Sequence, residues 1–256
     1  MFLNREMIAD SAVPDVVRQL NTDGIIEIPD VLDKSYVATC EQWVRDEIER
    51  NGSRYFSIVG RKKLQGTPFL DLGSDPDFKR FIRSISNKAS KLDFPEGDIF
   101  QVLRVVAGAS GKRRSNQFHF DATVVTALMP VVIPDGPAER SGDLIVYPNM
   151  RRVRRSPLLN LLQKVFLQNT VARTFFSTRV ARKMFGGRVV KLKPGSLYLF
   201  WGFRTYHGNM PCEISALRAT SLFHFGDPHA GTPIANATSA VRQWREARIL
   251  RQRATH

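Results

Sequence analysis

The chain has 256 residues, 43% of them hydrophobic, and a formal net charge of +14 at pH 7. This length and content suit one domain with a sizeable core. No run of about eighteen apolar residues occurs, and residues 1–6 lack the apolar core and cleavage site of a secretory signal. Two cysteines far apart, Cys40 and Cys212, argue against a disulfide scaffold. These observations predict a cytoplasmic protein.

The first part of the chain has a helical pattern. Helices are predicted over residues 7–20, 34–50 and 77–91, the second with apolar residues near the spacing of one helical face. A short strand is predicted over residues 25–29, between the first two helices. Residues 1–96 are therefore expected to form a helical N-terminal support.

From residue 97 the pattern changes to short apolar stretches separated by Gly and Pro turns. This pattern favours a sandwich or barrel over alternating βαβ units. The predicted fold class is mainly β: a double-stranded β-helix, the cupin-like jelly roll, over residues 97–226, with the helical part before it. A basic C-terminal helix over residues 227–256 is expected to dock on this single domain. The predicted strands are residues 99–105, 124–132, 143–147, 189–193, 197–200 and 216–225.

Most of the positive charge lies in one segment. Residues 144–212 contain thirteen Lys and Arg and no Asp or Glu. Within them, residues 150–187 are predicted to form a basic helical insertion, with a helix that starts at Ser156 and Pro157. Two interpretations stay open: an amphipathic surface that lies on an anionic membrane or charged partner, or a helical lid packed on its own sheet. The arginines that open the insertion are Arg151, Arg152, Arg154 and Arg155.

Residues 117–123 read Gln-Phe-His-Phe-Asp-Ala-Thr. If this stretch is a strand, His119 and Asp121 point to the same face because they are two residues apart. His207 is the candidate third ligand, since two histidines and one carboxylate on one face of an iron leave the opposite positions open for chemistry. The plainer interpretation is a hydrogen-bonded pair in a strand and a turn histidine.

Arg218 lies eleven residues after His207, in an apolar stretch, and Thr220 follows on the same face. A buried guanidinium without an acidic partner is costly, so an anionic ligand is its natural companion.

The ordered set His119-x-Asp121, His207 and Arg218-x-Thr220 resembles the signature of the iron(II)- and 2-oxoglutarate-dependent oxygenases, with a layout most similar to the phytanoyl-CoA hydroxylase-like branch. The helical opening, with Gly-Ile-Ile-Glu-Ile-Pro after the first helix, resembles the N-terminal part of the same family. The resemblance implies that the two histidines and Asp121 hold Fe(II) and carry catalysis. It also implies that Arg218 and Thr220 bind 2-oxoglutarate, with dioxygen as the other cosubstrate.

Other polar residues are weaker candidates. His224 alternates in phase with Arg218 and could point inward, but a structural role is preferred for it. Contacts to cosubstrate or substrate are predicted for Gln101, Arg104, Asn116 and Thr123.

The resemblance implies hydroxylation or desaturation of a C–H bond. From the charge we also expect an anionic substrate attached to a lipid or a carrier, such as the Kdo sugar of a lipopolysaccharide precursor or a thioester. The protein itself is expected to be either free in the cytoplasm or peripheral on the inner face of the membrane. The alternative is a non-enzymatic basic jelly-roll protein that binds nucleic acid or an anionic membrane. The sequence contains no recognised nucleic-acid motif, which argues against a nucleic-acid partner.

Overall fold

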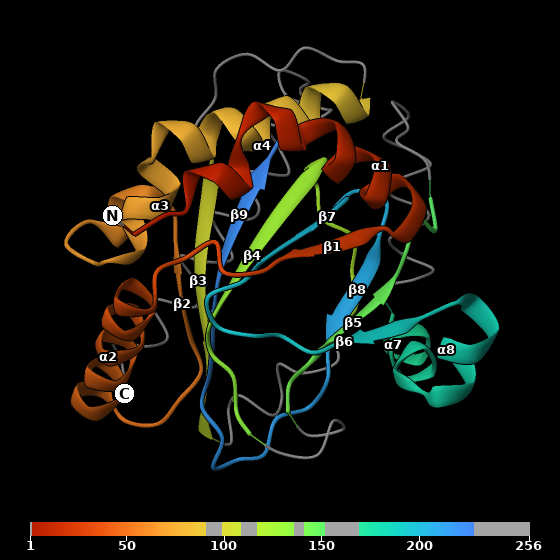
Figure 1. Cartoon of the computed structure of the whole chain (residues 1–256). Helices are drawn as coiled ribbons and strands as arrows, with labels where there is room; N and C mark the ends of the chain where they lie inside the picture. The colour runs from red at the N-terminus through yellow and green to blue at the C-terminus, as the bar shows by residue number, and fades with distance from the viewer. Residues whose placement is uncertain (1, 91–98, 109–116, 136–140, 152–168, 228–256) are drawn as a thin grey trace, which may run out of the picture.

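Two antiparallel sheets form the centre of the computed structural model, which describes residues 2–90, 99–108, 117–135, 141–151 and 169–227. The larger sheet has the order β1-β7-β4-β9-β3-β2 and the smaller has the order β6-β5-β8 (Figure 1). This arrangement confirms the predicted jelly-roll core. The strands are β1 (Ile25–Ile28), β2 (Phe56–Val59), β3 (Phe100–Val106), β4 (Val125–Val132), β5 (Leu144–Tyr147), β6 (Arg188–Val190), β7 (Leu197–Phe200), β8 (Tyr206–Asn209) and β9 (Arg218–Phe225).

The two sheets face each other through apolar side chains. Leu128 and Phe200 of the larger sheet pack in one buried cluster with Leu144 and Val146 of the smaller sheet. Along β9, successive residues point to opposite sides, so Ala219, Phe223 and Phe225 join the core beneath the helices. The alternate residues of β9 are therefore directed into the space between the sheets.

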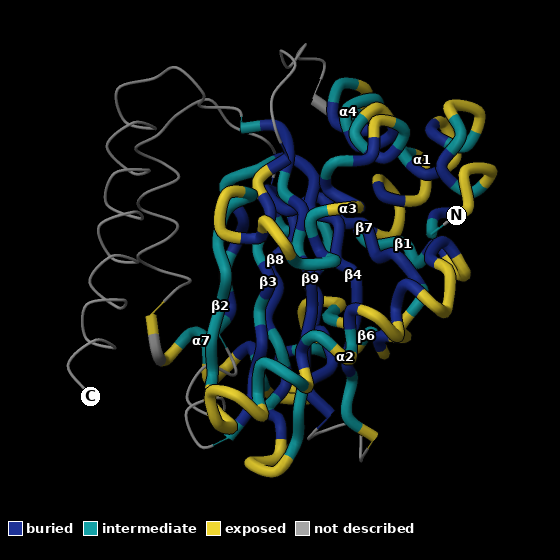
Figure 2. The backbone as a smooth tube through the Cα atoms, turned by 90° about the vertical axis from the view of Figure 1, so that its left-hand side faces the viewer, coloured by how far each residue is buried: buried dark blue, intermediate teal, exposed yellow. Residues whose placement is uncertain are grey.

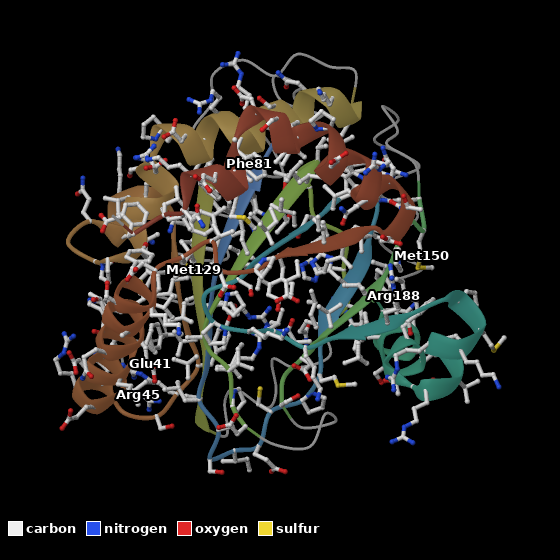
Figure 3. The ribbon with its side chains drawn as sticks, viewed as in Figure 1. Glu41, Arg45, Phe81, Met129, Met150 and Arg188 are labelled. Atoms are coloured by element: carbon white, nitrogen blue, oxygen red, sulfur yellow. The ribbon has the colours of Figure 1, made fainter. Side chains whose placement is uncertain are left out.

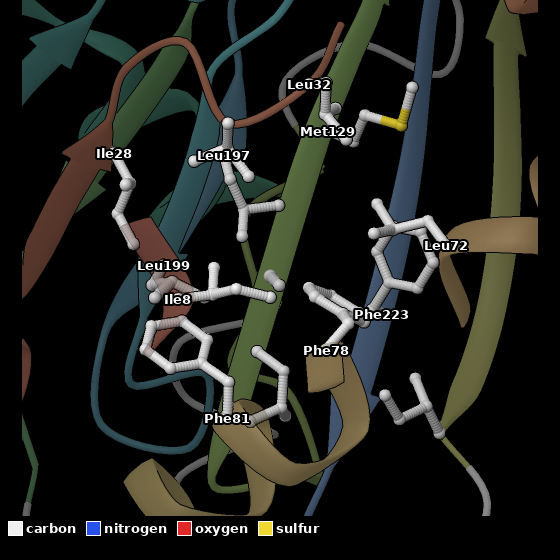
Figure 4. Packing of buried hydrophobic residues seen from close by; sticks show 14 of the residues in the cluster. Ile8, Ile28, Leu32, Leu72, Phe78, Phe81, Met129, Leu197, Leu199 and Phe223 are labelled. Atoms are coloured by element: carbon white, nitrogen blue, oxygen red, sulfur yellow. The ribbon is translucent and has the colours of Figure 1, made fainter. Parts of the chain in front are cut away.

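Helices cover the outer face of the larger sheet. The helix α4 (Pro76–Ser90) buries Phe78, Phe81, Ile82 and Ile85 completely, and this spacing of three and four residues places them on one face. Figure 4 shows Phe78 and Phe81 directed at the core residues that the sheet contributes. The other helical segments are η1 (Arg5–Ile8), η2 (Asp10–Ala12), α1 (Val13–Asp23), α2 (Lys34–Asn51), η3 (Arg61–Leu64) and α3 (Phe69–Ser74).

Several N-terminal elements differ from the sequence prediction. The helix predicted over residues 7–20 begins only at Val13, because two short 3-10 turns precede it and Pro14, which lacks an N–H, fits the first turn. The strand β2 and the helix α3 were not predicted. Both β1 and β2 pair into the larger sheet and form its edges, so residues 1–96 supply strands as well as helices. Figure 2 shows how the central strands are buried while much of the helical surface is exposed.

A pair of short helices stands on the outer face of the smaller sheet. These are α7 (Thr170–Ser177) and α8 (Arg179–Phe185), which Figure 1 shows at the side of the molecule away from α2 and α3. The helix predicted from Ser156 and the C-terminal helix predicted over residues 227–256 lie outside the described residues, apart from Asp227. Within the described part of the chain, no helix has both the length and the hydropathy that crossing a bilayer requires.

Replacing Phe78 with alanine is expected to lower the free energy of unfolding by about 3–5 kcal/mol, because the ring is fully buried and packs edge-on against Phe223 at 5.2 Å between centroids. Urea denaturation measures this change. The control is Ile214→Ala at a side chain that is 51% exposed, where a change within about 0.5 kcal/mol is expected. Equal effects of the two substitutions would contradict the packing of α4 described above.

Candidate metal centre

Two histidines are held side by side by their own backbones. The N–H of His119 donates to the carbonyl of His207 at 2.9 Å, and the N–H of His207 donates back to His119 at 3.0 Å. The two rings lie 4.5 Å apart between centroids. Residues 117–123 form this isolated bridge and not a continuous strand. The bridge nevertheless joins two sites that are far apart in the sequence.

Asp121 completes the cluster. Its backbone N–H donates to the carbonyl of Gly202 at 2.9 Å, which fixes the extended segment after His119. One carboxylate oxygen, Oδ1, lies 3.4 Å from Nε2 of His119, and the other, Oδ2, lies 3.7 Å from Nε2 of His207. Three potential metal-ligand atoms, one from each residue, lie within 4.8 Å of one another. The structure thus brings together the three residues that the sequence singled out.

The second ring nitrogen of each histidine determines its tautomer. Nδ1 of His119 lies 2.7 Å from the carbonyl of Gln117, and Nδ1 of His207 lies 3.0 Å from the carbonyl of Thr205. A carbonyl oxygen only accepts, so each Nδ1 carries the proton. In the neutral form of each ring, Nε2 then presents its lone pair toward the cluster, as a metal ligand requires.

The ionisation states also suit a cation. Burial lowers the pKa of His207 to about 4, so its imidazole is neutral at neutral pH. Burial alone would raise the pKa of Asp121, but the nearby histidines, His207 first and then His224, more than offset this and hold it well below its ordinary value. At neutral pH, the cluster therefore includes a carboxylate beside a neutral imidazole, and both can ligate a metal without first losing a proton.

A hydrogen-bonded chain supports the carboxylate from behind. The hydroxyl of Thr126 donates to Oδ2 of Asp121 at 2.5 Å, and Nδ1 of His224 lies 3.0 Å from the same hydroxyl oxygen. Because the hydroxyl proton is directed to Asp121, Nδ1 of His224 must be the donor to Thr126. Gly202 leaves room for this chain, since a Cβ there would lie 2.8 Å from Oδ2 of Asp121. The structure therefore places His224 beside the Asp121 carboxylate.

A cavity of about 230 Å³ extends from the cluster between the two sheets. Arg218 lines it and is only 1% exposed. With the amide of Asn209 turned so that its oxygen faces Arg218, that oxygen accepts from Nη1 at 2.8 Å and from Nη2 at 3.2 Å. The Nε atom of Arg218 is buried and has no hydrogen-bond partner among the described residues. Thr220 lines the same cavity.

Arg218 remains a cation in this environment. Burial lowers its pKa to about 10, which still leaves it protonated at neutral pH. Burial raises the pKa of the neighbouring Cys212, so the thiol stays neutral and does not compensate the charge. Asp143 is near enough to interact with Arg218 electrostatically, yet no ion pair joins Arg218 to a carboxylate within the described ranges. The cavity therefore holds a buried positive charge next to the candidate metal site.

The residues predicted as further contacts to substrate or cosubstrate differ in where the structure places them. Arg104 lines the cavity, directly opposite Thr220 in the register of β3 and β9. The predicted contact through Gln101 is wrong, because its amide turns to the helical side and donates to the carbonyl of Phe69. Among the described residues, the hydroxyl of Thr123 lies 3.5 Å from Nδ1 of His224, and Asn116 lies outside the described residues.

Arg151 is not a surface residue, contrary to its predicted place in an exposed basic cluster. Its guanidinium lies between the rings of Phe120 and Phe203, 4.0 Å from each centroid, and the side chain is buried. Nε donates to the carbonyl of Phe203, and Nη2 lies 3.5 Å from the carbonyl of Asp121. Arg151 thus holds the backbone on both sides of the cluster. Arg152, Arg154 and Arg155 lie outside the described residues.

The sequence also missed two contributors to the site. Thr126 sits in a strand whose residues are all buried, so its hydroxyl gave no periodic signal. Asn209 shares β8 with His207 and is two residues away, which was the one signal that could have identified it.

Comparison with known proteins gives similarity in fold. No family model matches the chain, and no curated protein matches it. The non-heme alpha-ketoglutarate-dependent epimerase SnoN from nogalamycin biosynthesis matches with a TM-score of 0.57 and 17% identity over 85% of this chain and 82% of SnoN. A prolyl 4-hydroxylase from Phytophthora capsici matches with a TM-score of 0.56 and 13% identity over 91% of this chain and 68% of that one.

A second structure of SnoN holds Fe3+, alpha-ketoglutarate and nogalamycin RO, and it matches with a TM-score of 0.53 and 15% identity over 85% of each chain. The chain therefore shares the fold of non-heme alpha-ketoglutarate-dependent enzymes.

Replacing Thr126 with valine is expected to weaken Fe(II) binding about 10- to 100-fold, because the hydroxyl that orients Asp121 is lost while the side-chain volume is kept. Anaerobic competition with a metal-binding dye measures this affinity. The matched control is Thr123→Val, whose hydroxyl makes no hydrogen bond to Asp121 and should leave the affinity nearly unchanged. Equal affinities of the Thr126 variant and the wild type would show that the carboxylate needs no such support.

Proposed function

We propose that the chain is an Fe(II)- and 2-oxoglutarate-dependent oxygenase of the phytanoyl-CoA hydroxylase-like branch. The observation that carries this proposal is the position of Arg218, a buried cation without an ion-pair partner among the described residues, in the same cavity as the His119, Asp121 and His207 cluster. A lone metal site would not need this cation. An anionic cosubstrate that also binds the metal accounts for both features.

His119, Asp121 and His207 would hold the iron. The two Nε2 lone pairs and the carboxylate converge within 4.8 Å, and two histidines with one carboxylate are the ligand set that leaves adjacent positions open for non-heme iron chemistry. The carbonyls behind both histidines and the Thr126 hydroxyl behind Asp121 keep these three groups oriented.

Arg218 would bind the distal carboxylate of 2-oxoglutarate. A guanidinium fork matches a carboxylate in geometry, and charge-assisted hydrogen bonds of this kind are stronger than neutral ones. The unpartnered Nε of Arg218 offers a donor, and the hydroxyl of Thr220, two residues along the same face of β9, offers another. Because Arg218 and the three metal-ligand candidates line one cavity, the 2-oxo acid end of the cosubstrate would reach the iron that His119, Asp121 and His207 would hold.

Fe(II), 2-oxoglutarate and dioxygen would together supply an oxidant that converts a C–H bond to C–OH, with succinate and carbon dioxide as coproducts. The protein binds and orients these groups and limits water. Apolar side chains from both sheets line the cavity alongside the polar groups, and this wall reduces access of water to the reacting atoms. The apolar lining residues are Val102, Leu128, Leu144, Phe200 and Leu222.

The substrate is proposed to be anionic and attached to a lipid or a carrier, with the Kdo sugar of a lipopolysaccharide precursor as one candidate. Arg104 supports this class, because it lines the cavity as a second guanidinium in addition to Arg218. With 2-oxoglutarate at the Arg218 end, Arg104 would add a second positive charge to the wall of the cavity that an anionic substrate enters. The basic segment over residues 144–212 would attract such a substrate at longer range.

Arg218→Ala is expected to weaken binding of 2-oxoglutarate to the Fe(II)-loaded protein about 10- to 100-fold, because a hydrogen bond to a charged group contributes about 1.5–3 kcal/mol. Anaerobic isothermal titration calorimetry measures this affinity. The control is Arg45→Ala in α2, which removes a solvent-exposed arginine and should leave binding unchanged. Failure of the wild type to bind 2-oxoglutarate in the presence of Fe(II) would contradict the proposed function.

A further inference from the structure

His224 lies beside the candidate metal ligands but is not one of the three residues that converge on a metal. It belongs to β9, and in the register of the larger sheet it faces Thr126 of β4. Its Nδ1 atom lies 3.0 Å from the hydroxyl oxygen of Thr126 and 3.7 Å from Oδ2 of Asp121. His224 therefore contacts the candidate metal centre from a neighbouring strand.

The alternation of β4 directs Thr126 toward this centre. Figure 3 labels Met129 of β4 and Phe81 of α4, which both belong to the core beneath the helices. Met129 follows Thr126 by three residues, an odd number, so the two side chains lie on opposite faces of the strand. The Thr126 hydroxyl is fully buried on the side of Asp121 and His224, where a polar group needs hydrogen-bond partners.

The hydrogen bonds in this chain of three residues have one direction. An ionised carboxylate only accepts, so Thr126 gives its single hydroxyl proton to Oδ2 of Asp121 at 2.5 Å. The hydroxyl oxygen of Thr126 then accepts from Nδ1 of His224. With this donor on one side, the Thr126 hydroxyl proton is directed to Oδ2. His224 thus determines which way the hydroxyl of Thr126 points.

The two carboxylate oxygens of Asp121 have different surroundings. Oδ2 accepts from Thr126 and lies against the backbone of Gly202, where an added Cβ would approach it to 2.8 Å. Nε2 of His207 lies 3.7 Å from this oxygen. Oδ1 lies 3.4 Å from Nε2 of His119. A hydrogen bond and close packing therefore hold Oδ2, and Oδ1 is the oxygen left for a metal.

We propose that His224 is a positioning residue that, through Thr126, holds Asp121 in the orientation that presents Oδ1 to the metal. This inference rests on the metal-binding part of the proposed function. Groups that hydrogen-bond to metal ligands orient those ligands and raise the affinity for the metal. Without the N–H of His224, the Thr126 hydroxyl can turn away and the carboxylate can rotate. Both of its oxygens could then reach the metal and occupy a position that the cosubstrate needs.

The Fe(II) affinity of the full chain, measured anaerobically by competition with a metal-binding dye, tests this inference. His224→Leu should weaken Fe(II) binding about tenfold, because it removes the donor to Thr126. His224→Gln should have a similar effect, because its amide lies where Nε2 was, on the far side of the ring from Thr126. His224→Asn places its amide nitrogen where Nδ1 was, so its Fe(II) affinity should match that of the wild type.

A double substitution shows whether His224 acts through Thr126. In a chain that carries Thr126→Val, adding His224→Leu should cause no further loss of Fe(II) affinity, because the hydrogen-bonded chain is already broken. The visible absorption spectrum of the Co(II)-loaded protein reports the arrangement of the metal ligands. The wild type and His224→Asn should share one spectrum, and the spectrum of His224→Leu should differ from it.

Phe100→Leu is the matched control, because the Phe100 ring lies 6.1 Å from that of His224 between centroids and cannot donate a hydrogen bond. It should leave the Fe(II) affinity and the Co(II) spectrum unchanged. Wild-type affinity in both His224→Leu and His224→Gln, weak binding by His224→Asn, or additive losses in the double variant would overturn the role of His224 alone. A wild type that binds no Fe(II) would overturn the proposed function as well.

Discussion

A buried positive charge and a buried negative charge occupy the space between the two sheets without forming an ion pair with each other in the described structure. Removing either charge from water is costly unless its hydrogen bonds are replaced. Asp121 is compensated by two histidines, His224 and the Thr126 hydroxyl, which together keep it ionised. Arg218 is compensated less completely, by the amide of Asn209. An anionic ligand would compensate the remaining charge of the guanidinium and accept a hydrogen bond from its Nε atom.

The fold satisfies this constraint by dividing the larger sheet into an apolar face and a polar face. Helices α1 to α4 supply the hydrophobic core on one face, so polar residues on the other face do not disturb it. Gly202 and Gly208 let the second sheet and its loop approach closely, since a Cβ at Gly208 would lie 2.9 Å from the ring of Phe118. The free-energy cost of burying the charged groups is thus offset by the hydrophobic core beneath the helices.

Most of the strands that carry the site could be predicted from the sequence. The period of two along residues 218–225 placed Arg218, Thr220 and His224 on one face, and the structure has them lining one cavity. The same period of two indicates that Gln101 lies on the helical face of the sheet, because it is two residues from the core residue Leu103.

Other parts of the site depend on contacts between distant residues and left no local pattern. The 117–123 segment is ordered by single hydrogen bonds to residues near 202 and 207, which no periodicity reveals. Arg151 lies in a basic run of the sequence and was therefore predicted to be exposed. In the structure, its guanidinium is buried between two aromatic rings and contacts two backbone carbonyls. The short edge strand β2 is partly exposed throughout, so its sequence lacks the alternation that would identify it.

The proposed oxygenase requires that the histidine and aspartate cluster and Arg218 act on one iron and one 2-oxoglutarate. The anaerobic visible absorption spectrum of the protein with Fe(II) and 2-oxoglutarate measures this, because a 2-oxo acid bound to Fe(II) through both of its oxygens gives a weak charge-transfer band. We expect this band in the wild type, its loss in His119→Ala and its weakening in Arg218→Ala. A wild-type protein that retains no iron and shows no band would rule out the shared site.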